Sequence, residues 1–260
     1  MGGYPIFSCG DWTQLPAELE HLEGTIVSLS LVTDPFGDYD ERLLRECFPD
    51  VMVPFKEHFV IDLTGTLETS VCSHHRRYAK NALKHVQVEQ CRAPETCIDD
   101  WMRLYTMLIK KRGITGIATF SRHCFEKQLR VPGIVAFRAY SQDRTIGMLL
   151  WYVQGDKAYY HLGAYDEMGY RVHASFGLFW SAIRFFAEAG LQRINLGAGA
   201  GTKSDGADGL SRFKRGWATG TQTAYFCGRI LDRGKYAEIS KATGVGKTDY
   251  FPAYRTGEFA

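Results

Sequence analysis

Two neighbouring stretches decide the fold: Asn195-Leu-Gly-Ala-Gly-Ala-Gly201 and Gly209-Leu-Ser-Arg-Phe-Lys-Arg-Gly-Trp217. The first follows a short apolar run and has three glycines in five residues, so its backbone can approach a ligand closely or simply turn tightly. The second holds one lysine and two arginines within four residues, which suits an anionic ligand or negative charge that develops in a reaction. Because Gly-x-x-x-x-Gly-Lys-Ser/Thr is absent from the sequence, we exclude a P-loop nucleotide hydrolase.

Composition sets the class of protein. The chain has 260 residues, enough to bury a sizeable core as one large domain or two small ones. Its net charge of +2 does not suit a protein that coats nucleic acid. The sequence shows no signal-peptide pattern and no apolar run that approaches the length of a membrane span, so we expect a cytoplasmic protein with no membrane partner. Its seven cysteines include no Cys-x-x-Cys, and we expect reduced thiols, no disulfide scaffold and no metal site.

Hydrophobic periodicity predicts helices and strands in an order typical of a mixed α/β sheet with at least one crossover. The turn Gln154-Gly-Asp-Lys157 predicts a hairpin, and Gly190 is expected to end a long helix. We divide the chain at residue 90 into two parts, residues 1–90 and 91–260. The helices are expected at residues 39–47, 70–84, 94–112, 121–130, 174–189 and near 236, and the strands at residues 25–32, 59–63, 87–90, 134–140, 145–153, 158–163, 192–196 and 221–230.

Positive charge is concentrated in three short clusters, of which the helix at residues 70–84 is the largest. Ser73 is its expected N-cap, and its basic residues recur at i, i+4 spacing, so several share one face. With residues 110–112 and 212–215, this pattern favours a protein that grips one end of a polyanion, and an ordinary solvated helix face is the alternative. The basic residues of the helix are Arg76, Arg77, Lys80 and Lys84, and we expect the two arginines to be exposed.

From about residue 70 to residue 228 the chain resembles the GNAT acyltransferase superfamily, and within it the Fem-like branch. Three features carry the likeness. The first is the basic helix, and the third is the Phe-Lys signature at residues 209–217. The second is a strand with the sequence Tyr159-Tyr-His-Leu-Gly-Ala164 that leads into a long helix and then into the strand Arg193-Ile-Asn-Leu-Gly197. The resemblance implies a GNAT-like fold. Residues 91–260 would form the acyltransferase domain, and residues 1–90 a shortened N-terminal GNAT-like subdomain.

The resemblance also implies acyl transfer to an amine. Ordinary GNAT members use acetyl-CoA, whereas the Fem-like branch includes members that use aminoacyl-tRNA. The GNAT pyrophosphate loop is altered here to Arg171-Val-His-Ala-Ser-Phe-Gly177, and Phe176 is expected to crowd a diphosphate. We therefore predict the acceptor end of aminoacyl-tRNA as co-substrate, no bound cofactor, and a small amine-bearing metabolite or peptide as acceptor. An acetyl-CoA-dependent N-acetyltransferase and a non-catalytic binding module on the same scaffold are the alternatives.

Two residues are the predicted catalytic groups. Aminolysis of an ester passes through an oxyanion, which the Lys214 ammonium can stabilise, and the matching lysine is assigned this role in the Fem-like branch. His161, or a neighbouring carboxylate of Asp166 or Glu167, can take the proton of the attacking amine. A solvated lysine and a hydrogen-bonded structural histidine are the alternatives.

Further residues are expected to hold the two substrates. Phe213 offers a stacking face to the terminal adenine of tRNA, unless it is a core aromatic residue. Arg171 and Ser175 flank a helix N-terminus that favours an anion, unless they only cap the helix. We expect acceptor contacts from Tyr159 and Asn195. The predicted donor-binding residues are Phe213, Arg215, Arg171, Ser175, Arg76, Arg77 and Lys80.

Overall fold

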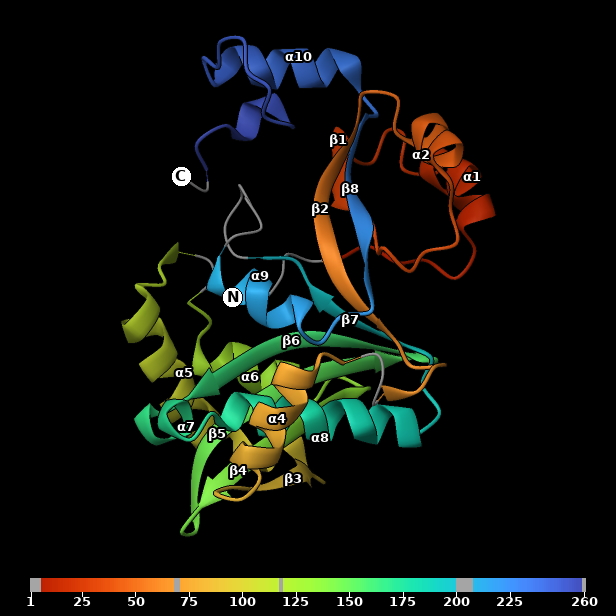
Figure 1. The fold of residues 1–260 in the computed structure, drawn as a ribbon. Helices are drawn as coiled ribbons and strands as arrows, with labels where there is room; N and C mark the ends of the chain where they lie inside the picture. Colours follow the sequence, from red (N-terminus) through yellow and green to blue (C-terminus); the bar gives the residue numbers. More distant parts are fainter. Residues whose placement is uncertain (1–5, 68–70, 117–118, 200–207, 259–260) are drawn as a thin grey trace. The chain divides into compact units, whose positions relative to one another are not determined.

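The computed structural model describes residues 6–67, 71–116, 119–199 and 208–258. The chain forms two compact units (Figure 1). The first spans His58–Thr221, and the second joins the segments before and after it, up to Glu57 and from Gln222. The expected boundary at residue 90 therefore falls inside the first unit. The boundaries between the units lie within strands β2 (Val51–Asp62) and β8 (Gly220–Ile230), and each strand is continuous across its boundary.

The first unit contains a mixed sheet in the order β2-β7-β6-β5-β4-β3. Antiparallel pairing joins all of these neighbours except β6 and β7, which are parallel. A parallel pair needs a crossover, and helices α7 (Glu167–Arg171) and α8 (Ala174–Glu188) supply it. The predicted mixed α/β sheet is thus confirmed. The other strands are β3 (Gln87–Cys91), β4 (Ile134–Ser141), β5 (Arg144–Gln154), β6 (Lys157–Tyr165) and β7 (Arg193–Gly197).

Helices cover both faces of this sheet (Figure 1). Helices α4 (Ser73–Ala82) and α8 pack on one face, and α5 (Ile98–Arg112) and α6 (Arg122–Gln128) on the other. Both faces of the sheet are therefore buried. In strand β5, side chains alternate between two apolar clusters, one on each face. Leu149 and Trp151 belong to the α8 side, and Met148 and Leu150 to the α5 side.

Turn residues end the elements largely where the sequence predicted. Gln154 pairs with Lys157 across a two-residue turn whose Gly155 has a φ of 59°, which confirms the hairpin. Gly190, with a φ of 81°, follows the last turn of α8. The N-cap of α4 differs from the expectation: Cys72, not Ser73, occupies that position, and its side chain makes no capping hydrogen bond.

Some elements were missed by the hydrophobic pattern. The first half of β2 carries Pro54, which lacks an N–H for a strand ladder and argues against a strand in a sequence. Helix α1 (Leu15–Glu20) and helix α7 are too short for a helical period to stand out.

The second unit pairs β1 (Ser28–Val32) with β8 in antiparallel register. Its core gathers around Trp12, Leu44, Phe48 and Cys227. That residues 1–90 include a shortened GNAT-like subdomain stays a prediction. Its remaining helices are α2 (Glu41–Cys47), α10 (Arg233–Ala242) and the short turns η1 (Trp12–Gln14) and η4 (Ala253–Arg255).

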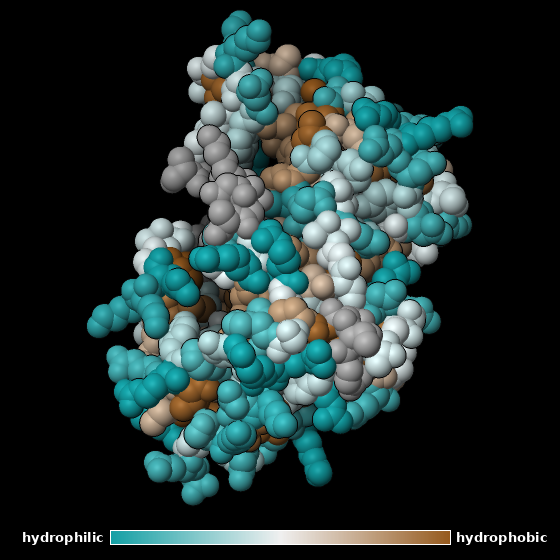
Figure 2. Space-filling view, in the orientation of Figure 1, coloured by the Kyte–Doolittle hydropathy of each residue, from teal (hydrophilic) through white to brown (hydrophobic). Residues whose placement is uncertain are grey.

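The molecular surface in Figure 2 is hydrophilic over most of the face shown, with apolar side chains in small separate areas. Among the described residues, none of the helices has the length and apolar character that crossing a membrane requires.

Candidate active site

Strands β6 and β7 separate soon after they pair. Their parallel ladder covers only three residue pairs and ends at Tyr159 opposite Asn195. Strand β6 then continues to Tyr165 and β7 to Gly197, and the two diverge (Figure 1). Helix α9 (Gly209–Arg215) lies close to this divergence. A parallel pair that opens in this way offers the edge of both strands to a ligand.

The side chain of Lys214 reaches into this divergence from α9. Its Nζ donates a hydrogen bond of 2.6 Å to the carbonyl oxygen of Ala198, directly after β7. The same Nζ lies 5.7 Å from the ring centroid of Tyr160 on β6, within cation–π range. Only 3% of Lys214 is exposed to solvent, so the solvated-lysine alternative does not fit this structure.

Burial changes the acid–base behaviour of this lysine. Removal of water from around the ammonium lowers the pKa of Lys214 to about 7, and the negative charge of Asp208 partly opposes that shift. Both protonation states are therefore accessible near neutral pH. The ammonium can stabilise an oxyanion, and the free amine can accept a proton.

Gly197 provides the room that this arrangement needs. Its φ is 73°, a left-handed value that favours glycine, and a Cβ atom there would lie 3.3 Å from the Lys214 Nζ. The glycine-rich stretch was predicted to allow a close approach of the backbone to a ligand. In this structure, Gly197 allows a close approach of the backbone to Lys214. The last two residues of the stretch, Ala200 and Gly201, lie outside the described residues.

Asn195 and Tyr159 end the β6–β7 ladder side by side. Asn195 is 2% exposed, and its Oδ1 accepts a hydrogen bond of 2.7 Å from the Gly197 amide and lies 3.0 Å from the His58 Nδ1. Its Nδ2 is buried and has no hydrogen-bond partner among the described residues. A buried donor without a partner in the protein is a candidate to bind an acceptor atom of a water or a substrate. His58, which no sequence motif marks, joins the candidate site through this contact.

Phe213 lies in an aromatic cluster beneath α9, formed with His75, Phe176, Phe179 and Trp217. Its ring centroid is 4.9 Å from that of Phe179 and 5.1 Å from that of Phe176. This packing fits the core-aromatic interpretation better than a free stacking face. Arg215, two residues on, is exposed, and its guanidinium lies 5.7 Å from the ring of Phe59.

His161 lies on the opposite face of the sheet from Lys214. A shift in register between β5 and β6 falls at this residue, and its Nε2 is 2.8 Å from the Oε1 of Gln128 on α6. Tyr160, by contrast, packs against Phe179 of α8. Burial lowers the pKa of His161 to about 4, so it is neutral at physiological pH. The two predicted catalytic residues are therefore not brought together.

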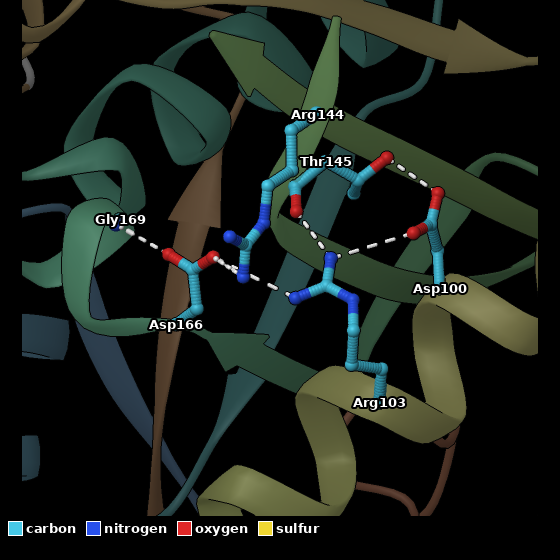
Figure 3. Close-up of polar contacts among 6 residues, drawn as sticks. All are labelled: Asp100, Arg103, Arg144, Thr145, Asp166 and Gly169. Carbon is cyan, nitrogen blue, oxygen red and sulfur yellow. Dashed lines mark hydrogen bonds and ion pairs between the residues drawn. The ribbon is translucent and has the colours of Figure 1, made fainter.

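Asp166 is also engaged by neighbouring residues (Figure 3). One of its oxygens lies 3.6 Å from Arg103 Nη1 and 3.3 Å from Arg144 Nη2, and the other accepts a hydrogen bond of 2.9 Å from the amide of Gly169. Arg103 also donates to the carbonyl oxygen of Thr145. These contacts join α5, β5 and the first turn of α7, which gives Asp166 a structural role as the cap of α7.

The fold agrees with a family comparison. A model described as an acetyltransferase (GNAT) domain matches residues 70–215, more than half of the chain. The chain belongs to this GNAT family. No curated protein sequence matches it.

Solved structures match the GNAT fold over most of the chain. FemX has a TM-score of 0.69 at 14% identity, covering 90% of this chain and 82% of its own. The C-terminal DUF2156 domain of an Agrobacterium fabrum protein, assigned as a lysylphosphatidylglycerol synthetase, has a TM-score of 0.58 at 15% identity, with 76% of this chain and 67% of its own covered. L-PGS from Bacillus licheniformis has a TM-score of 0.54 at 14% identity, covering 75% and 65%. These matches confirm the predicted Fem-like GNAT fold.

In this GNAT protein the position of the pyrophosphate loop is the junction of α7 and α8. The amides of Val172, His173 and Phe176 already donate to backbone carbonyls, at 3.0, 3.2 and 3.0 Å. The ring of Phe176 lies in the aromatic cluster with Phe213 and Trp217. Arg171 is exposed at the end of α7, and Ser175 is half-buried in the first turn of α8.

The basic helix α4 presents part of its charge to solvent. Arg77 and Lys80 are exposed, as is Lys84 just after the helix. Arg76 differs from the expectation, because it is half-buried and its Nε is buried without a hydrogen-bond partner among the described residues. The three exposed residues remain candidates for contact with phosphates.

Proposed function

We propose that this GNAT acyltransferase moves an aminoacyl group from aminoacyl-tRNA to the amine of a small metabolite or peptide. The buried Lys214 ammonium, at the point where β6 and β7 diverge, is the observation that carries the proposal. Aminolysis of an ester develops negative charge on the carbonyl oxygen. A cation fixed in a site with little water stabilises that oxygen more than the neutral ester, and so lowers the barrier.

In this reaction the acceptor amine attacks the ester carbonyl carbon. A C–N bond forms, the C–O bond to the terminal ribose breaks, the amine loses a proton and the ribose oxygen gains one. His161 and Asp166 are engaged by Gln128 and by two arginines. We therefore assign the proton transfer to the substrate's own groups, with Lys214 facing the oxyanion.

Two observations support tRNA as the donor. The amides that a GNAT loop would offer to a diphosphate are largely occupied by backbone carbonyls at the α7–α8 junction. Helix α4 exposes Arg77 and Lys80, which suit contact with phosphates near one end of a polyanion. The name of one structural neighbour, a lysylphosphatidylglycerol synthetase, also denotes an aminoacyl product.

The alternative is an acetyl-CoA-dependent N-acetyltransferase, which the description of the family model favours. A non-catalytic module is disfavoured, since an ammonium buried against a carbonyl rather than a carboxylate costs stability without a structural return. Direct binding separates the two donors. Calorimetry of acetyl-CoA should show no binding at micromolar concentrations, and aminoacyl-tRNA should bind with an affinity that falls steeply as salt rises. Micromolar affinity for acetyl-CoA would favour the alternative.

A further inference from the structure

Cys72 and His75 form a pair that the acyl-transfer reaction does not use. Cys72 is the N-cap of α4, and His75 lies in its first turn, three residues later. The Cys72 Sγ lies 3.2 Å from the His75 Nδ1. Cys72 is exposed, whereas the other six cysteines, all within the described residues, are buried or half-buried.

The backbone of α9 fixes the tautomer of His75. Its Nε2 lies 2.9 Å from the carbonyl oxygen of Phe213, which can only accept a hydrogen bond. The proton of the neutral ring is therefore on Nε2, and Nδ1 carries the lone pair that faces the Cys72 thiol. Burial lowers the pKa of His75, against the opposing effect of the Phe213 hydrogen bond, so the neutral ring predominates. Nucleophile, base and orienting group stand in the order found in activated thiol sites.

Cys72 also occupies the N-cap of a ten-residue helix, whose dipole favours negative charge that develops at that end during a reaction. Around the His75 ring, the titratable neighbours recorded in the structure are Cys72 and His74, whose Nδ1 is 3.5 Å away.

We propose that Cys72 is an activated thiol, with His75 as its base, and that it is a site of reversible modification by small disulfides. The thiol proton moves to His75 Nδ1, and the sulfur attacks one sulfur of the disulfide. A new S–S bond forms at Cys72, the old S–S bond breaks, and one small thiol leaves with the proton. The balance requires only a low-molecular-weight disulfide such as glutathione disulfide.

The modification would act on the helix that carries Lys214. The Cys72 amide donates a hydrogen bond of 3.2 Å to the carbonyl oxygen of Gly216, and His75 binds the Phe213 carbonyl oxygen. These two contacts tie the end of α9 to the start of α4. An adduct at Cys72 removes the thiol from His75 and should loosen this tie, whichever acyl donor the enzyme uses.

The test measures the rate of adduct formation with glutathione disulfide at pH 7, with the modified cysteine mapped by mass spectrometry. A free thiol is only a few per cent thiolate at this pH, so we expect Cys72 to react about tenfold faster than the same cysteine in a synthetic peptide of residues 69–77. His75→Gln should remove this advantage, and the matched variant His74→Gln should keep it. Cys72→Ser should leave the other cysteines slow.

The peptide comparison needs only the wild-type protein, so it decides the proposal even if His75→Gln does not fold. A rate at Cys72 equal to or below that of the peptide would overturn the proposal, as would equal effects of the two histidine variants. The expected consequence for α9 is faster hydrogen–deuterium exchange at residues 209–215 in the adduct. None of these measurements depends on the acyl donor, so failure here and failure of the proposed function are distinguishable.

Discussion

Burial of the Lys214 side chain sets the protonation state on which the proposed reaction depends. Its Nζ donates to a neutral carbonyl oxygen and faces an aromatic ring, and the negative charge of Asp208 only partly offsets the effect of burial on its pKa. The Phe-Lys signature identifies this lysine in the sequence, but the sequence does not show how deeply its side chain is buried. The depth follows from the packing of α9 over two diverging strands.

Lys214→Met is expected to lower kcat far more than it changes KM, because the lost ammonium acts mainly on the transition state. The expected loss is about 10²–10³-fold, or roughly 2.7–4 kcal/mol. Lys214→Arg should restore only part of it, since a guanidinium spreads its charge and directs its donors differently. Steady-state kinetics would measure both, with the exposed Arg212→Met on the same helix as control. A raised KM with normal kcat would make Lys214 a binding residue.

The pKa of Lys214 predicts a pH dependence. With the pKa lowered to about 7, the ammonium predominates below that pH and is lost as pH rises through it. An oxyanion stabiliser therefore predicts that kcat falls above about pH 7. Because Lys214→Arg stays charged, the ratio of wild-type to variant kcat removes the titration of the acceptor amine. A ratio that rises with pH would instead assign Lys214 as a proton acceptor.

At the scale of elements, the contact between α4 and α9 organises the site. Long-range contacts such as His75 with the Phe213 carbonyl join residues far apart in the chain, and no local periodicity encodes them. This explains why the basic helix and the Phe-Lys segment could each be found in the sequence while their contact could not. The same holds for His161, whose place on the opposite face depends on a register shift in β6. Its pairing with Gln128 follows from that shift.

Gly216→Ala should destabilise this contact. A Cβ atom at Gly216 would overlap the ring of His75, which two hydrogen bonds hold in place. Overpacking of this kind costs about 1–3 kcal/mol of unfolding free energy, more than alanine contributes as a better helix former. Urea denaturation would measure it. Gly209→Ala is the control, because its Cβ would have no neighbour within 4 Å among the described residues, and stability should change little.

Charge on α4 should govern binding of the polyanionic donor. Reversing Arg77 and Lys80 to glutamate is expected to weaken tRNA binding and to reduce its salt dependence, since two phosphate contacts would be lost. The half-buried Arg76 is left unchanged, because its substitution would also disturb packing. Filter binding at several salt concentrations would test this, with Lys241→Glu and Lys247→Glu combined, both exposed, as a control with the same change in net charge. If the dependence of tRNA binding on salt concentration were unchanged, α4 would be an ordinary solvated helix without phosphate contacts.

At the scale of the whole molecule, alternating and continuous apolar runs were enough to predict a mixed α/β sheet, and its motifs were enough to place it among GNAT proteins. The division into two units was not predictable in the same way. The chain leaves the second unit within β2 and returns to it within β8, so the boundary falls inside continuous strands rather than in a polar linker. Pro54, and the polar run Lys56-Glu-His58 that separates this part from the apolar residues after it, hid the first half of β2 from the hydrophobic pattern.

The central claim is that a GNAT fold with a buried lysine here transfers an aminoacyl group from tRNA. The most direct measurement incubates the purified protein with a set of small amines and either labelled aminoacyl-tRNA or labelled acetyl-CoA, with and without ribonuclease. We expect label from aminoacyl-tRNA to appear in an amide product, to be lost when the tRNA is digested first, and to be nearly absent with Lys214→Met. Label transferred from acetyl-CoA, insensitive to ribonuclease, would contradict the claim.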